Sequence, residues 1–189
     1  MFLTRPFEQR ARLMFESDGN ILRQAVREAL LHGELRVLVE AIYADVEREL
    51  AALQPRCEMS GRCCRFEEYG HRLFVTTAEL AVFAASAADC PAALALLENE
   101  DAGGCRFQEG RMCQAHPIRP LGCRMFFCDP AHEEKLQALY ERLHARLKAL
   151  HDDLGITYCY VEWRSGVAAV TPLIKARLDP ALGAPNHDV

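Results

Sequence analysis

The sequence predicts a mainly α fold with a small β component (α+β), in which helices surround a loop-rich cysteine site and a short C-terminal hairpin follows. Three observations predict this class. Apolar residues recur at helical spacing over much of the chain, and two short runs are rich in β-branched and aromatic residues. The third observation is a cysteine-rich stretch in the middle of the chain, which is interrupted by glycine and proline. With 189 residues, half of them hydrophobic, the chain can bury one sizeable core.

Two helices are expected near the N-terminus. The first has Asp18 as its N-cap and apolar residues at helical spacing over residues 21–30. The second covers residues 35–53, has one apolar face, and is ended by Pro55. We expect this pair to pack on the rest of the chain, and its apolar stripes also offer a surface for a homodimer.

The middle of the chain is expected to form short elements. Residues 73–75 favour a strand, and Thr76 and Glu79 then form the capping box of a helix. Residues 91–99 are dominated by alanine and leucine, which favours another helix or helical turn.

The last third of the chain is expected to form a long helix and a hairpin. Asp129 and Pro130 supply the N-cap and N1 residues of the helix, which ends at Gly155. Residues 156–163, and residues 167–170 after an Arg-Ser-Gly turn, favour two paired strands. The chain then divides into an N-terminal helical pair (1–55), a cysteine-rich metal-binding domain (56–178) and a flexible tail (179–189).

The cellular location decides how the nine cysteines are interpreted. Arg5 and Glu8 interrupt the N-terminus, so we expect no signal peptide, and no stretch approaches the roughly 20 apolar residues that cross a bilayer. A cytoplasmic protein without membrane contact is expected, in which thiols stay reduced and clustered thiols bind metal or do redox chemistry. Cys90 and Cys159 stand alone in apolar surroundings and are expected to be buried as small hydrophobic residues.

The net charge of the chain is -5, and this negative charge makes nucleic acid an unlikely partner. Positive charge nevertheless collects around the clustered cysteines. Residues 56–65 hold three arginines and one glutamate, a local charge of +2, and residues 105–128 hold four arginines and one glutamate, a local charge of +3. Guanidinium groups near thiolates would offset their charge and donate hydrogen bonds to sulfur. The alternative is a basic surface patch for an anionic partner.

Seven cysteines fall into two groups that we expect to fold onto one another around metal. Cys105 and Cys113 flank Glu109 and Gly110, a sequence suited to a short hairpin that brings the two thiols together. Cys128 stands at the start of a helix, where the dipole favours thiolate. The candidate metal ligands are Cys57, Cys63, Cys64, Cys105, Cys113, Cys123 and Cys128, with His116 as a weaker eighth donor.

Two motifs resemble the CxxCxxCC (YkgJ-like) family of zinc- or iron-chelating domains. The family pattern opens with C-x2-C-x2-C-C, and residues 57–64 (CEMSGRCC) match it except that Ser60 stands at the second cysteine position. The pattern continues with C-x5-R-P-x2-C-R-x-F, which residues 113–126 (CQAHPIRPLGCRMF) match completely. The resemblance covers about residues 57–128 and implies a chelated metal, with one donor fewer at Ser60 because a hydroxyl is a poor ligand for soft metals.

Arg119 and Arg124 occupy the family's R-P and C-R positions. As cofactor-binding residues they would neutralise the thiolates or fix loops through carboxylate pairs. The resemblance also permits a protein-modifying reaction, and so an unknown protein partner or protein substrate. No catalytic residue is predicted, because the chain contains no G-x-S-x-G, P-loop, G-x-G-x-x-G or H-E-x-x-H motif.

Three functions remain open from the sequence. The first is an iron-sulfur protein whose cluster supports redox or protein-modifying chemistry, favoured because the thiols exceed the needs of one zinc site. The second is a zinc-stabilised binding module without catalysis. The third is a thiol-based metal-trafficking or redox protein.

Overall fold

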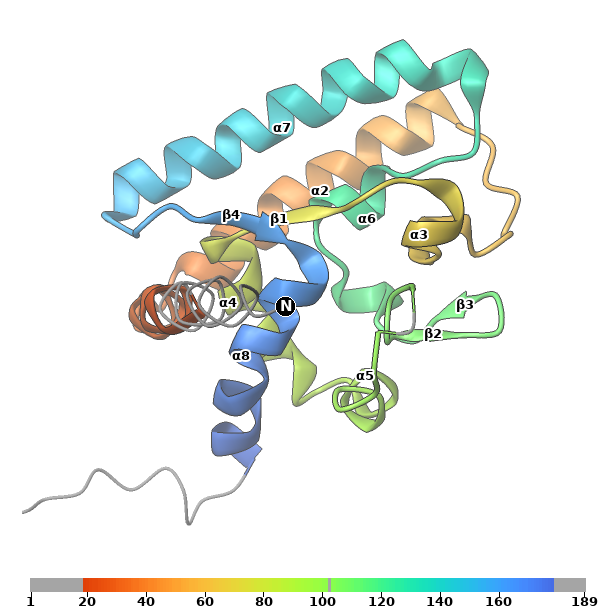
Figure 1. Cartoon of the computed structure of the whole chain (residues 1–189). Coiled ribbons are helices and arrows are strands. Elements are labelled where there is room, and N and C mark those ends of the chain that lie inside the picture. Colours follow the sequence, from red (N-terminus) through yellow and green to blue (C-terminus); the bar gives the residue numbers. More distant parts are fainter. Residues whose placement is uncertain (1–18, 102, 179–189) are drawn as a thin grey trace, which may run out of the picture.

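The structure is a computed structural model that describes residues 19–101 and 103–178. Figure 1 shows the long helices α2 (Leu35–Leu53) and α7 (Glu133–Leu154) along one side of the molecule, with α4 (Thr77–Ala87) and α8 (Trp163–Leu178) packed beneath them. The mainly α class with a small β component is confirmed. The remaining elements are short: η1 (Arg62–Cys64), α3 (Phe66–Tyr69), β1 (Phe74–Thr76), α5 (Pro91–Ala95), β2 (Gln108–Glu109), β3 (Met112–Cys113), η2 (His116–Ile118), α6 (Leu121–Met125), η3 (Pro130–His132) and β4 (Tyr160–Glu162).

The two N-terminal helices are present. Residues 19–29 are helical, while the expected N-cap, Asp18, lies outside the described residues. α2 buries Val39, Ile42 and Val46 at helical spacing and packs against α4, α6 and α7. One hydrophobic core extends from the first helix to α8, so the helical pair and the cysteine region share their buried surface.

The expected C-terminal hairpin is wrong in its second half. β4 is a strand, but it pairs antiparallel with β1, and residues 167–170 belong to α8. These residues form a helix because Trp163, Val167 and Val170 recur at helical spacing and are buried against α4. Gly166, expected in a turn, lies inside this helix; a Cβ there would come within 3.0 Å of Leu80 Cδ1, so the glycine permits close helix packing.

The capping box at the start of α4 is confirmed, and its glutamate does more than cap the helix. The Glu79 side chain is buried, and its Oε2 accepts from the backbone N–H (2.9 Å) and the hydroxyl (3.0 Å) of Thr76. Its Oε1 accepts from the Leu121 N–H at 2.8 Å and from the Tyr43 hydroxyl at 3.2 Å. One carboxylate therefore joins α2, the start of α4 and the start of α6.

The long C-terminal helix begins in two steps. Asp129 caps the 3₁₀ turn η3, with its Oδ1 accepting from the Ala131 N–H at 3.2 Å, and α7 follows from Glu133. Gly155 ends α7 in the left-handed conformation (φ +65°), as expected. Among the residues that the structure describes, no helix combines the length and apolar character that crossing a bilayer requires.

Candidate metal centre

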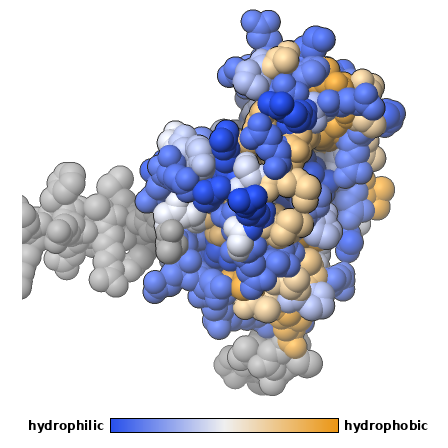
Figure 2. All heavy atoms as spheres, turned by 90° about the vertical axis from the view of Figure 1, so that its right-hand side faces the viewer, coloured by the Kyte–Doolittle hydropathy of each residue, from blue (hydrophilic) through white to orange (hydrophobic). Residues whose placement is uncertain are grey.

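All seven clustered cysteines line one cavity of about 240 Å³, which we call the cysteine cavity. It lies at the end of the molecule where α3 and the β2–β3 hairpin project (Figure 1), and on this side an apolar band runs between mostly hydrophilic side chains (Figure 2). Phe66, Phe107 and Trp163 also line it and are almost fully buried. Cys90 and Cys159 lie outside it, and the Cys90 thiol donates instead to the Gln114 carbonyl at 3.6 Å.

Close backbone contacts join the two cysteine groups. The Cys105 N–H donates to the Cys64 carbonyl at 2.7 Å, and a Cβ at Gly104 would stand 2.7 Å from that same oxygen. Gly61 adopts φ +74°, and a Cβ there would lie 2.4 Å from Gln108 Nε2 and 3.2 Å from Arg111 Cα. A side chain at Gly104 would collide with the Cys64 carbonyl, and the left-handed φ at Gly61 favours glycine beside the Arg111 backbone, so these two glycines allow the segments to meet.

The expected hairpin between Cys105 and Cys113 is confirmed. Strands β2 and β3 pair through Gln108 opposite Cys113, and Gly110 turns the chain with φ +60°. His116 follows in η2 and also lines the cavity, although its side chain is exposed. Partial burial and the nearby Arg119 lower the pKa of His116, so the imidazole is neutral and able to act as a ligand near pH 7.

Five of the thiols form an inner group: Cys63, Cys64, Cys105, Cys113 and Cys123. The Sγ atoms of Cys63 and Cys64 lie 4.0 Å apart. A hydrogen bond from Cys64 lowers the pKa of Cys63 to about 6, and the same thiol lowers the pKa values of Cys105 and Cys113, while its own pKa is raised by these bonds. Burial first, and then the charges of the neighbouring thiolates, raise the pKa of Cys123. Thiolates so close together repel one another, so a bound cation would stabilise the group.

The two predicted arginines occupy different places. Arg119 lines the cysteine cavity, its charge helps to lower the pKa values of Cys63 and Cys113, and its buried Nε has no hydrogen-bond partner in the part of the chain that the structure describes. Arg124 lies outside the cavity, stacked over the Tyr43 ring at 4.3 Å. It donates to Glu47 Oε1 and to the carbonyls of Pro117 and Arg119, and so fixes the loop before α6.

Trp163 is a site residue that the sequence analysis missed. Its indole Nε1–H donates to Cys105 Sγ at 3.4 Å from the first turn of α8. It lies 58 residues from that cysteine. No spacing or motif connects the two, and the contact arises only because α8 packs on α4 beneath the cavity.

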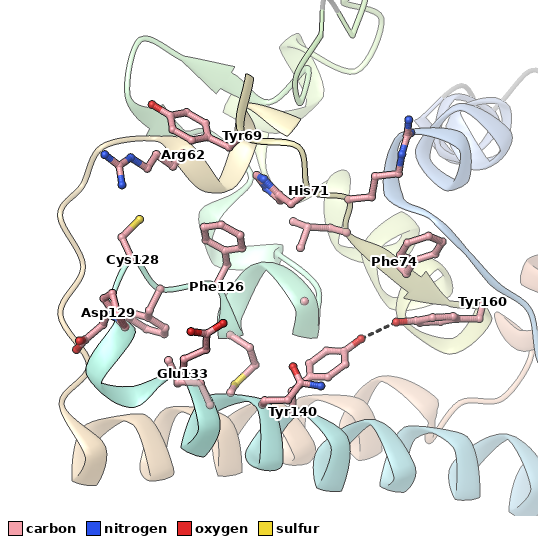
Figure 3. Close-up of a pocket in the computed structure, with 18 residues that line it drawn as sticks. Arg62, Tyr69, His71, Phe74, Phe126, Cys128, Asp129, Glu133, Tyr140 and Tyr160 are labelled. Carbon is pink, nitrogen blue, oxygen red and sulfur yellow. Dashed lines mark hydrogen bonds between the residues drawn. The ribbon is translucent and has the colours of Figure 1, made fainter. Parts of the chain in front are cut away.

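Cys57 and Cys128 also line the cavity, at the end that we call its mouth because Cys57 is exposed there. Cys57 is exposed, Cys128 is partly buried, and Cys128 Sγ lies 3.8 Å from the Ser60 hydroxyl, at the position where the family pattern has a cysteine. Cys128 also lines a second hollow of about 650 Å³ between α3, β1 and α7, the aromatic cleft (Figure 3). The cleft is lined by Tyr69, Phe74, Phe126, Tyr140 and Tyr160, among others.

Within residues 19–101 and 103–178, no three histidine, cysteine, aspartate or glutamate side chains stand ready as the ligands of one metal ion. Cys63, Cys105 and Cys113 instead hydrogen-bond to Cys64. A tetrahedral zinc-thiolate site places its sulfurs about 3.8 Å apart, as follows from Zn–S bonds of about 2.3 Å. The 4.0 Å between the sulfurs of Cys63 and Cys64 is close to this value.

Comparison with family models, with curated proteins and with solved structures gives no match for this chain. The case for a metal centre therefore rests on the residues themselves.

Gly61→Ala is expected to destabilise the metal-free protein by about 2 kcal/mol or more, because a Cβ adds left-handed strain to a clash with the Arg111 backbone. Metal affinity should fall as well, since the loop that holds Cys63 would move off the hairpin. The matched control is Gly70→Ala, which has a similar φ of +64° but no atom within 4 Å of its Cβ. Urea unfolding under reducing conditions measures both variants. Equal losses of stability in the two would show that the close approach at Gly61 is unimportant.

Proposed function

We propose that this chain is a metal-binding protein whose inner thiols, Cys63, Cys64, Cys105, Cys113 and Cys123, hold an iron-sulfur cluster. The supporting observation is the convergence of thiols from three separate parts of the chain on one cavity, where Cys64 hydrogen-bonds to Cys63, Cys105 and Cys113. Convergence of this kind is unnecessary for packing alone: Cys90 and Cys159, expected to be buried, are only partly buried and pack singly against the core.

The donor chemistry and the size of the cavity both fit this group. Sulfur donors select zinc, copper(I) and iron-sulfur clusters over calcium or magnesium. A single water-sized occupant needs only about 10–15 Å³, whereas the cysteine cavity measures about 240 Å³. The cavity therefore has room for an occupant of several atoms.

Two donors in the cavity wall would support a negatively charged thiolate cluster. Arg119 brings a guanidinium whose buried Nε lacks a partner among the described residues, and Trp163 already donates to a cysteine sulfur. Hydrogen bonds to sulfur and exclusion of solvent are what the protein contributes to the potential of such a cluster. A cluster held here would supply one-electron redox chemistry, and the aromatic wall would shield it from water.

A zinc-stabilised module is the second candidate, and the scarcity of regular structure around the cavity favours it. The strands β2 and β3 contain two residues each, and the neighbouring elements are single helical turns. Such loops bury little apolar surface of their own, so a structural metal ion would hold them together.

Anaerobic purification, followed by metal and sulfide analysis, tests the proposal and separates the two candidates. We expect a brown protein that contains iron and acid-labile sulfide. Trp163, the only tryptophan, should be strongly quenched because an absorbing cluster would lie beside Cys105, and chelation should restore its fluorescence. A colourless protein with stoichiometric zinc, unchanged by reconstitution with iron and sulfide, would exclude the cluster. Absence of any bound metal after both treatments would exclude metal binding altogether.

A further inference from the structure

The mouth of the cysteine cavity contains sulfur groups that differ from the inner thiols in their exposure. Cys57 is exposed, and the Met59 and Met112 side chains, which also line the cavity, are 62% and 53% exposed. Of the inner thiols, Cys64 is buried and the other four are partly buried. Cys57, Met59 and Met112 therefore offer soft sulfur donors that are open to solvent.

Cys57 and Cys128 are brought together by a contact between their neighbours. The Arg56 N–H donates to Asp129 Oδ2 at 2.8 Å, which ties the loop after α2 to the start of η3. Ser60 extends the same loop to within 3.8 Å of Cys128 Sγ. Met59, between these two contacts, adopts φ +48°, a conformation that costs a non-glycine residue free energy and persists only where its surroundings impose it.

Cys128 is the one clustered cysteine that lines both hollows. The aromatic cleft and the cysteine cavity also share Arg62, Phe126 and Phe127 as walls. In Figure 3, Cys128 lies at the edge of the cleft beside Arg62 and Asp129, where the loop before η1 passes. Cys57, the exposed member of the seven clustered cysteines, is therefore open to a metal ion from solvent, and Cys128 is open to the aromatic cleft as well as to the cysteine cavity.

We propose that Cys57 and Cys128, assisted by the thioethers of Met59 and Met112, form an uptake site that captures a thiophilic metal ion and passes it to the inner thiols. This inference rests on the proposed metal-binding function. Transfer is a ligand exchange in which bonds from the metal to the outer sulfurs break as bonds to inner thiolates form. Each inner thiol loses its proton to water or to the released outer thiolate, and the oxidation state of the metal does not change.

The rate of Zn²⁺ uptake tests this inference, since Zn²⁺ binds thiolates whether or not it is the natural metal. The double variant Cys57→Ser/Cys128→Ser should bind as much Zn²⁺ at equilibrium as the unaltered protein but take it up at least tenfold more slowly, as measured by stopped-flow competition with a chromophoric chelator. The control is Cys90→Ser/Cys159→Ser, which also removes two thiols but both from outside the cavity, and it should change neither quantity. Uptake at the unaltered rate would overturn the inference, and so would a lower final stoichiometry, because the pair would then be permanent ligands.

Alkylation of the Zn²⁺-loaded protein gives a second measurement. Iodoacetamide followed by peptide mass spectrometry should modify Cys57 and Cys128 while the five inner cysteines stay protected. Protection of all seven would place the outer pair among the permanent ligands. If the unaltered protein binds no Zn²⁺ and all seven react, the proposed function itself fails; if it binds Zn²⁺ and only the kinetic difference is missing, the uptake site alone fails.

Discussion

Cys123→Ser is expected to abolish stable metal binding. Cys123 lies on α6, is partly buried, and contributes to the inner group with Cys63, Cys105 and Cys113. A serine hydroxyl is a poor ligand for soft metals. The loss of affinity should exceed the roughly 10–100-fold that removal of an outer-shell partner costs. Metal content after anaerobic reconstitution and gel filtration is the measurement.

The control for this variant is Cys159→Ser, because Cys159 is partly buried but lies outside the cavity. It should bind the same amount of metal as the unaltered protein. In the presence of metal, Cys123→Ser should also unfold at lower urea concentration, since a ligand that binds only the native state stabilises it by mass action. Full metal content in Cys123→Ser would refute the assignment of the inner group.

Glu79→Ala is expected to destabilise the protein by about 4 kcal/mol, because each buried donor left without a partner costs about 1–3 kcal/mol. The substitution would leave the Thr76 N–H, the Leu121 N–H and the Tyr43 hydroxyl unpaired in the core. Leu121 begins α6, so the helix that positions Cys123 would loosen too. Urea unfolding of the metal-free, reduced protein measures the stability, and Zn²⁺ titration measures the effect on the site.

Two further substitutions make this result interpretable. Glu79→Gln keeps one acceptor oxygen and should lose less stability than Glu79→Ala. Glu49→Ala removes a carboxylate from an exposed ion pair with Arg142, and such pairs contribute about 0–1 kcal/mol. If Glu79→Ala lowers the free energy of unfolding by less than about 1 kcal/mol, the groups that donate to Glu79 must find other hydrogen-bond partners in the variant, as exposed groups do.

The local elements were predictable because their signals are local. The apolar face of α2, the capping box at Thr76, the turn at Gly110 and the end of α7 at Gly155 each depend on residues within a few positions of one another. The C-terminal hairpin failed because β-branched and aromatic residues favour strands only where a strand partner is at hand. β4 pairs with β1, whereas the residues after β4 are buried as a helix that packs on α4.

The sequence by itself determined which residues can bind a soft metal: seven clustered cysteines and the arginines between them, since donor type and spacing are properties of the chain. Only the tertiary structure decided where each of these cysteines and arginines lies relative to the cavity. It placed Arg119 in the cavity and Arg124 outside it, brought Trp163 to Cys105, and left Cys57 exposed at the mouth while Cys64 is buried inside. The physical reason is that burial and contact depend on which distant segments pack together, here through the close approaches at Gly61 and Gly104, and no local pattern encodes them.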